Sequence, residues 1–261
     1  MDHPIVVTGA PGAGKTTLVA HLARALDLPV ALPGGNPASR RIDALKLKMH
    51  GVGLDEVGNA GVIETCAYGE GYSGQAGTVI AVIDAVALSG RSATLTHAAL
   101  AEVRGADLVV LTRGDLVDTN AVRAMLAAQT DMPVVEAAFG KLALQDLPAP
   151  VSRRIDLPSR TAPAMWEYSG GARLDQTLAG QLLKNRPKGT MRIKGVAIAG
   201  EAGLELDQTG RARSVTVCSE PPETMLFACG PSGAFSEQMM GLHFAEIAAA
   251  GAATAGWFGF R

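Results

Sequence analysis

Short apolar runs alternate with helical patterns along the first part of the chain. The runs predict buried strands at residues 5–7, 61–64, 78–83, 106–111 and 133–136, with a briefer one at 30–32. Apolar residues at helical spacing predict helices over 15–26, 38–50, 95–105 and 121–130. Strands that alternate with helices are typical of a parallel sheet covered on both faces. We therefore expect an α/β domain with a mainly parallel sheet over residues 1–148.

The pattern changes after residue 147, where prolines and arginines gather. We interpret residues 149–162 as a linker. Beyond it, predicted strands at 164–168, 190–199, 204–207, 214–218 and 225–229 follow one another closely. Helices are predicted at 174–183 and 236–249. This arrangement predicts a small α+β domain with a mainly antiparallel sheet over residues 163–261.

Composition narrows the classes of function. The 261 residues carry a net charge of −2, which gives no electrostatic case for nucleic acid or a membrane surface as a partner. Hydrophobic residues make up 48% and charged residues 18%, so a folded chain is expected. The three cysteines, Cys66, Cys218 and Cys229, form no C-x-x-C pair. That usage, and a start unlike a signal peptide, predict a cytoplasmic protein.

The stretch GAPGAGKTT, residues 9–17, satisfies the phosphate-loop pattern G-x-x-x-x-G-K-[ST] between a predicted strand and a predicted helix. Its glycines allow backbone N–H groups to point at a phosphate, and the helix N-terminus adds positive charge. We expect Lys15 to reach the β- and γ-phosphates and the Thr16 hydroxyl to hold Mg²⁺. The binding residues would be Gly12, Ala13, Gly14, Lys15, Thr16 and Thr17. The alternative is a glycine-rich turn without a ligand.

A phosphate loop needs a second carboxylate to hold Mg²⁺, usually at the end of a strand. GVIETCAYG offers Glu64, and AVIDAV offers Asp84. Each acid follows β-branched residues, and for at least one of them the alternative role is to cap a helix.

The stretch VVLTRGDLV, residues 109–117, is the second candidate binding loop. Its apolar residues end in Thr112-Arg113-Gly114-Asp115, as a buried parallel strand ends in a loop at its carboxyl edge. The Asp115 carboxylate can accept from the N1–H and the 2-amine of guanine together, and adenine offers no such pair. A buried acceptor without a donor costs roughly 1–3 kcal/mol, so adenine would be rejected. The alternative role of Asp115 is a helix N-cap.

The order of these motifs resembles the CobW family of P-loop GTPases, relatives of the nickel-enzyme maturation GTPases HypB and UreG. In that family the phosphate loop is followed by E-[ST]-[ST]-G, a strand ending V-D-A, and N-K-x-D. The corresponding stretches here are ETCA at 64–67, VIDA at 82–85 and TRGD at 112–115. AAFG at 137–140 stands at the place of the loop that closes over the base, which implies binding roles for Phe139 and Gly140. MWEYSGGARLDQ, RPKGTMRIKGVAIAG and TMLFACGPSGAFSEQMM resemble the CobW carboxyl domain.

The chain also departs from the family pattern. The C-x-C-C motif that binds zinc or cobalt is absent, which weakens a metal-chaperone role. Ala67 replaces the glycine that ends E-T-x-G and narrows the allowed backbone geometry, which predicts slow hydrolysis. Thr112 replaces the asparagine that braces the loop. Arg113 replaces the lysine that packs along the base, and an arginine can stack on a purine face.

The resemblance implies a protein that binds GTP and Mg²⁺, hydrolyses GTP slowly, and contacts a client protein through its carboxyl domain. The client would be a metalloenzyme or a cobalamin-pathway protein. Thr16 and Glu64 would hold the metal, and Glu64 or Asp84 would orient the attacking water. Two alternatives stay open. One is a nucleotide-dependent regulatory or scaffold subunit without turnover, and the other is an ATP-dependent small-molecule kinase with Arg40 and Arg41 in its lid.

Overall fold

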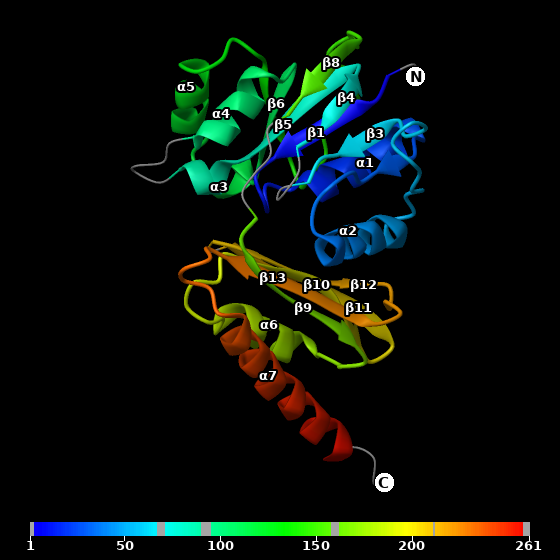
Figure 1. The fold of residues 1–261 in the computed structure, drawn as a ribbon, viewed down its shortest axis with the longest axis vertical. Helices are drawn as coiled ribbons and strands as arrows, with labels where there is room; N and C mark the ends of the chain where they lie inside the picture. The colour runs from blue at the N-terminus through cyan, green and yellow to red at the C-terminus, as the bar shows by residue number, and fades with distance from the viewer. Residues whose placement is uncertain (1–2, 67–70, 90–94, 158–161, 211, 258–261) are drawn as a thin grey trace. The chain divides into compact units, whose positions relative to one another are not determined.

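The computed structural model describes residues 3–66, 71–89, 95–157, 162–210 and 212–257. Contacts divide the chain into two compact units. Unit 1 contains residues 1–36 and 50–161, and unit 2 contains residues 37–49 and 162–261. Figure 1 shows the elements of both units.

A six-stranded sheet forms the centre of unit 1, in the order β2-β3-β1-β5-β6-β7. The strands are β1 (Ile5–Gly9), β2 (Val30–Ala31), β3 (Val62–Glu64), β5 (Thr78–Asp84), β6 (Leu108–Thr112) and β7 (Val134–Ala137). Every neighbouring pair is parallel. The predicted α/β fold with a mainly parallel sheet is confirmed.

The apolar runs form strands because both faces of this sheet are covered. Every residue of β1, β5 and β6 is buried. Helices α1 (Lys15–Leu26), α3 (Ala85–Leu88), α4 (His97–Arg104) and α5 (Asn120–Ala127) follow strands of the sheet (Figure 1). Short 3-10 turns lie at η1 (Gly114–Leu116) and η2 (Leu144–Asp146). This order brings the carboxyl ends of β1, β3, β5, β6 and β7 to one edge of the sheet.

Part of the segment interpreted as a linker is a strand of unit 1. β8 (Arg153–Asp156) pairs antiparallel with β4 (Ser73–Ala76) in a separate two-stranded sheet. Arg153 donates to both carboxylate oxygens of Asp107, at 2.7 and 2.8 Å. The same carboxylate accepts from the backbone N–H of Val79 at 2.8 Å, so this ion pair joins β8 to the start of β5.

Unit 2 contains a five-stranded antiparallel sheet in the order β12-β11-β10-β13-β9. Its strands are β9 (Ala164–Gly170), β10 (Arg192–Ala199), β11 (Ala202–Thr209), β12 (Ala212–Cys218) and β13 (Thr224–Gly230). Helices α6 (Gln176–Lys184) and α7 (Glu237–Trp257) bury apolar residues against one face of the sheet. Within the described ranges, no helix is both long and apolar enough to cross a membrane.

Helix α2 (Pro37–Met49) belongs to unit 2, although it lies between β2 and β3 in the sequence. It contacts β10 and β13. Side chains alternate between the two faces of a strand. Ile193 and Leu206 therefore join the apolar cluster with α6 and α7, whereas Lys194 and Glu205 point to the α2 face. The sheet of unit 2 is thus covered by helices on both faces.

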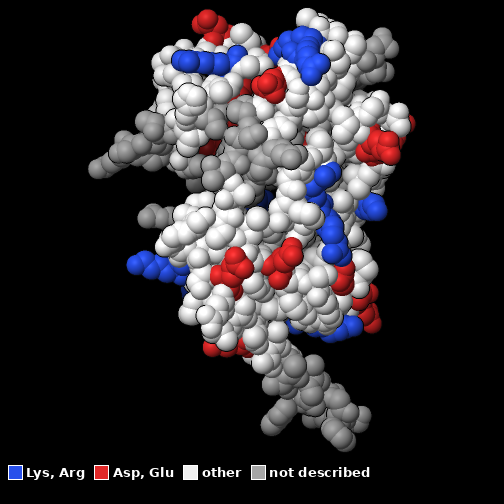
Figure 2. Space-filling view, in the orientation of Figure 1, with Lys and Arg blue, Asp and Glu red and all other residues white. Residues whose placement is uncertain are grey.

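Surface charges are mixed. Figure 2 shows Lys, Arg, Asp and Glu scattered over the visible face, with no continuous area of one sign. This distribution matches the net charge of −2.

Candidate functional site

The phosphate loop connects β1 to α1 and depends on its glycines. Gly12 and Gly14 have φ values of 77° and 92°, a region that favours glycine. A Cβ atom on Gly14 would come within 3.2 Å of the Thr112 side chain. The loop therefore has both the backbone geometry and the close packing that its sequence pattern requires. Gly14 is also the N-cap of α1 and provides no side-chain cap, which leaves the first N–H groups of the helix at the loop.

Lys15 is buried and curls over this loop. Its ammonium group donates to the carbonyl oxygens of Gly9 at 2.9 Å and Ala10 at 3.1 Å. In a loop of this pattern, the backbone N–H groups and the lysine ammonium can both donate to phosphate oxygens. Lys15 and the helix N-terminus together make the loop a fitting site for a polyphosphate.

Thr16 and Glu64 lie side by side at the edge of the sheet. The Thr16 hydroxyl donates to Glu64 Oε1 at 2.8 Å. Glu64 ends β3, which runs parallel to β1, and it is 7% exposed. A hydroxyl and a carboxylate are oxygen ligands of the kind that Mg²⁺ prefers. The residues present therefore fit a magnesium ion next to the phosphate loop.

The TRGD loop contacts the phosphate loop directly. The Thr112 hydroxyl donates to the carbonyl oxygen of Ala13 at 2.7 Å and also approaches that of Ile83 at 3.3 Å. Arg113 donates to the carbonyl oxygen of Gly12. Two consecutive side chains thus bind two consecutive carbonyl groups of the phosphate loop, which fixes the position of one loop relative to the other.

Asp84 lies beside Arg113. Its Oδ2 forms an ion pair with the Arg113 guanidinium at 2.9 Å, and its Oδ1 accepts from the backbone N–H of Val86 at 3.0 Å. Asp84 ends β5 and caps α3, and its register partner on β6 is Thr112. Asp84 therefore holds Arg113 across the phosphate loop, whereas Glu64 lies beside Thr16.

Asp115 is exposed in the short turn η1 and makes no hydrogen bond to a described residue. The helix that follows, α5, begins at Asn120, and its first backbone N–H is bound by Asp118 at 2.9 Å. The N-cap position of α5 is Thr119, and the N-cap of η1 is Arg113, so Asp115 caps neither element. The Asp115 carboxylate is available to solvent at the carboxyl edge of β6.

Glu136 holds the segment that follows this turn. It accepts from Thr119 at 2.8 Å and from Arg123 at 2.9 Å. The hydrogen bond from Arg123 lowers the pKa of Glu136 below its ordinary value. A Cβ atom on Gly114 would come within 2.9 Å of Glu136, so only glycine fits here without a shift.

The loop after β7 packs tightly on α1. Phe139 is 83% exposed and has a φ of 52°, unusual for a bulky residue. Gly140 has a φ of 73°, and a Cβ atom there would be 2.5 Å from the Thr17 side chain. The His21 ring contacts the carbonyl oxygen of Leu142 at 2.8 Å. These contacts hold an exposed aromatic ring at the sheet edge that carries the TRGD loop, beside the end of the phosphate loop.

The remaining sequence predictions concern the switch and metals. Ala67 lies outside the described residues. Cys66 is partly exposed at the end of β3. Within the described part of the chain, no three His, Cys, Asp or Glu side chains are grouped as a transition-metal site would require.

Sequence reasoning missed three contacts of the site. They are the Asp84–Arg113 ion pair, the packing of Gly140 on Thr17, and a buried hydrogen bond from the Thr8 hydroxyl to Glu102 at 2.9 Å. The partners in these contacts are 29, 123 and 94 residues apart in the sequence. Only the Asp84–Arg113 ion pair could have been found from the sequence, because an arginine that follows a strand can pair with an acid at the end of the neighbouring strand.

No protein-family model matches the chain, and no curated protein matches it. Solved structures do match. The Zn(II)-bound YjiA GTPase from E. coli is 16% identical, with 95% of this chain and 99% of that chain covered and a TM-score of 0.35. HypB from Helicobacter pylori in complex with nickel is 15% identical, with 52% and 79% covered and a TM-score of 0.37. The signal recognition particle receptor FtsY from Elizabethkingia anophelis is also 15% identical, with 57% and 62% covered and a TM-score of 0.37.

Proposed function

We propose that the chain binds GTP with Mg²⁺ and hydrolyses it slowly, and that unit 2 contacts a client protein. The observation that carries this proposal is the set of contacts between the phosphate loop and the TRGD loop at residues 112–115. Thr112 and Arg113 bind carbonyl groups of the phosphate loop, and Asp115 beside them remains exposed. A phosphate site and an exposed carboxylate at neighbouring strand ends suit a purine nucleotide whose base carries two donors.

Guanine is the base that this carboxylate fits. Its N1–H and 2-amine can both donate to Asp115, whereas adenine has no such pair. The exposed ring of Phe139 lies on the loop that follows the neighbouring strand β7, and an aromatic ring can stack on a base. We propose that Thr112, Arg113, Asp115, Phe139 and Gly140 form the base site.

The phosphate chemistry falls to the other loop. Lys15 and the backbone N–H groups of residues 12–17 would stabilise the negative charge that develops on the phosphates. Thr16 and Glu64 would hold Mg²⁺, which supplies charge neutralisation at the β- and γ-phosphates when bound. Since both carboxylate oxygens of Asp84 already have partners, we assign Asp84 the positioning of Arg113 and Glu64 the orientation of the attacking water.

The kinase alternative has less support. Its lid candidates lie on α2, and Arg41 forms an ion pair with Glu223 of unit 2 at 2.9 Å. The exposed Asp115 also has no evident role in a site for adenine.

Asp115→Asn tests the base assignment. The amide replaces one acceptor with a donor, which suits xanthine because xanthine has a carbonyl group in place of the 2-amine. The variant should lose about ten- to a hundredfold in GTP affinity and gain relative affinity for XTP, while ATP stays poor for both proteins. A competition series with the three nucleotides measures this. Asp118→Asn is the matched control, because Asp118 only accepts from the backbone N–H of Asn120 and its substitution should leave the order of affinities unchanged.

If the wild type holds ATP as well as GTP, and Asp115→Asn changes neither, the guanine assignment is wrong. Turnover is measured separately, by phosphate release from GTP in wild type and Glu64→Gln. An equally fast release from the two proteins would contradict the role of Glu64.

A further inference from the structure

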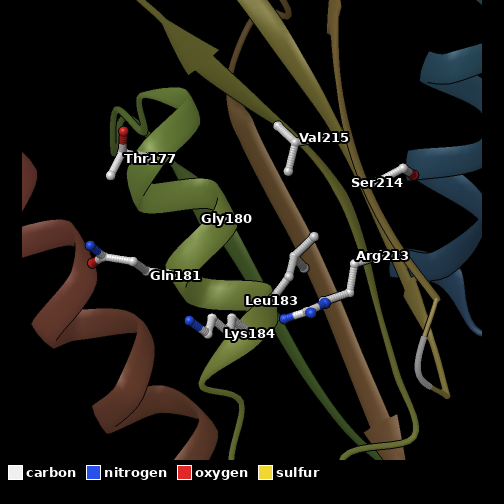
Figure 3. Close-up of a pocket in the computed structure, with 8 residues that line it drawn as sticks. All are labelled: Thr177, Gly180, Gln181, Leu183, Lys184, Arg213, Ser214 and Val215. Carbon is white, nitrogen blue, oxygen red and sulfur yellow. The ribbon is translucent and has the colours of Figure 1, made fainter.

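Unit 2 has an open groove between α6 and the edge strand β12. Its volume is about 350 Å³. The lining residues come from α6 on one side and β12 on the other: Thr177, Gly180, Gln181, Leu183, Lys184, Arg213, Ser214 and Val215 (Figure 3). None of these residues belongs to the nucleotide site of unit 1.

One wall of the groove is the backbone of a sheet edge. β12 pairs with β11 on one side, and on its other side the described residues contain no strand. About half of the N–H and C=O groups of an antiparallel edge strand point away from its neighbour. The Ser214 side chain points toward the α2 side in Figure 3, so this residue lines the groove with its backbone. The groove therefore presents backbone donors and acceptors to an occupant.

The side chains of β12 make this edge attractive to an extended peptide. Arg213, Val215 and Val217 share one face by their period of two, and Val215 packs against the apolar cluster under α6. Val217 is 64% exposed. β12 is a seven-residue edge strand. Proteins normally avoid exposed β-branched residues on such a strand unless a partner strand covers them.

The groove is also positively charged at one end. Lys184 ends α6, and Arg213 reaches from β12 toward that end of the helix (Figure 3). Both residues are exposed, and in the described part of the chain neither pairs with a carboxylate. The lining residues include no Asp or Glu. An occupant that carries a carboxylate would complement this end.

Gly180 lines the groove on the α6 side. It lies in the middle of α6, where glycine is a poor helix former. A Cβ atom there would meet nothing within 4 Å, so packing inside the chain does not require glycine. The bare backbone widens the groove opposite β12. Gly180 therefore leaves room for an occupant on the α6 side of the groove.

We propose that this groove binds an extended, acidic segment of another protein, which adds as a strand to β12 and places a carboxylate between Lys184 and Arg213. Backbone hydrogen bonds to β12 would supply affinity, and the two cations would select acidic sequences. The inference rests on the proposed function only where it identifies the partner as the client of unit 2.

The test uses the full chain without nucleotide and a synthetic peptide, acetyl-Thr-Val-Glu-Val-Asp-Val-Thr-amide. We expect calorimetry to show binding with a dissociation constant below about 1 mM. A version with lysine in place of both acids should bind at least about tenfold more weakly. A version with proline in place of the central valine should lose a similar factor, because it lacks one backbone donor. Amide hydrogen exchange in β12 should slow when the acidic peptide is bound.

Variants of the groove locate the site. Gly180→Met should abolish binding because its side chain fills the groove, while Gly180→Ala should bind nearly as the wild type. Both should keep or raise the melting temperature, since each residue is a better helix former than glycine. Lys184→Ala and Arg213→Ala should each weaken binding about threefold. Lys188→Ala, which removes an exposed charge outside the groove, should not change it.

Several results would overturn the proposal: no binding of the acidic peptide at about 1 mM, equal binding of the acidic and basic peptides, or full binding to Gly180→Met. Sedimentation adds another. If the chain self-associates and Gly180→Met abolishes this, the occupant is a second copy and not a client. Each variant is also titrated with GTP. In the variants, loss of peptide binding should leave GTP binding intact. If the wild type binds GTP but not the acidic peptide, the groove alone is rejected, and if it binds the peptide but not GTP, the nucleotide function alone is rejected.

Discussion

Lys194 provides the sharpest test of how α2 is held on the sheet of unit 2. Its side chain is 5% exposed and donates to Asp43 Oδ2 at 2.5 Å and to the carbonyl oxygen of Ser39 at 3.0 Å. Burial lowers the pKa of Lys194 below its ordinary value of 10.5, and the nearby Asp43 carboxylate opposes that shift. The perturbation is Lys194→Met, which removes the charge and keeps much of the side-chain length.

The magnitude follows from what the substitution leaves behind. Asp43 is 17% exposed, so Lys194→Met leaves a largely buried carboxylate without its ammonium partner. Removal of one member of a buried pair costs about 3–5 kcal/mol. Because Asp43 retains some contact with water, we expect the lower end, about 3 kcal/mol. The double variant Lys194→Met/Asp43→Leu removes both charges, and it should lie within about 1 kcal/mol of the wild type.

The assay is denaturant unfolding followed by tryptophan fluorescence. Both tryptophans, Trp166 and Trp257, lie in the sequence of unit 2, so the signal reports on that unit. The wild type, the two single variants and the double variant form a double-mutant cycle. Free-energy changes that simply add would refute the reasoning, because they would mean that the Lys194–Asp43 pair is not an interacting unit. A double variant as unstable as Lys194→Met would refute it as well.

The pH dependence gives the same test an independent signal. Since the folded pKa of Lys194 is below 10.5, the unfolded chain binds more protons at pH values between the folded pKa and 10.5. The free energy of unfolding should therefore rise with pH through this window, as the cost of the buried charge is relieved. The difference in the free energy of unfolding between wild type and Lys194→Met should show this rise with pH. If another group causes the rise, both proteins show it and it cancels in the difference.

Three further predictions concern unit 1. Lys15→Ala should abolish nucleotide binding and cost no more than about 1 kcal/mol of stability, because the ammonium contacts loop carbonyl groups and not the apolar core. Calorimetry that finds equal GTP affinity in the variant and the wild type would contradict the phosphate assignment. Arg113→Met and Asp84→Asn should each weaken GTP binding about five- to fiftyfold. The double variant should bind no more weakly than the more severe single variant, because each substitution removes the Asp84–Arg113 ion pair. Additive losses in a GTP titration would show that the two residues do not act as a unit. In competition with a chromophoric chelator, Zn²⁺ and Co²⁺ should bind weakly to the wild type and equally weakly to Cys66→Ser. A tight site that is lost in Cys66→Ser would instead support a metal-chaperone role.

Features that depend on neighbouring residues could be predicted from the sequence. The strands of the parallel sheet are continuous β-branched runs because they are buried on both faces, and such runs stand out in any sequence. The phosphate loop is equally local, since its glycines, Lys15 and Thr16 lie within nine residues between a strand and a helix. Parallel strand ends meet at one edge of the sheet, which brings both Glu64 and Asp84 near the phosphate loop, and the family resemblance implied Glu64 as the partner of Thr16.

Contacts between distant loops could not be predicted in the same way. The expectation for Arg113 concerned stacking on a base, and it did not include the contacts of the guanidinium with the Gly12 carbonyl group and with Asp84. The hydrogen bond from the Thr112 hydroxyl to the Ala13 carbonyl group at 2.7 Å was not among the expectations either. Both outcomes depend on how β5 and β6 bring their ends together, and residue type alone does not determine that.

Helix α2 shows why the limits of a unit can escape sequence analysis. Its position between β2 and β3 suggests a helix of the parallel sheet, but its buried polar residues have their partners in unit 2. Lys46 is 5% exposed and pairs with Glu205 at 2.8 Å, and Asp43 pairs with Lys194. The basic residues of this helix give no local sign that Lys46 will be buried or that Asp43 will pair with a buried lysine. The chain runs from this helix through residues 50–61 directly into β3, the strand that ends in Glu64. The acid that we assign to Mg²⁺ is therefore linked through one short segment to a helix that unit 2 holds by ion pairs.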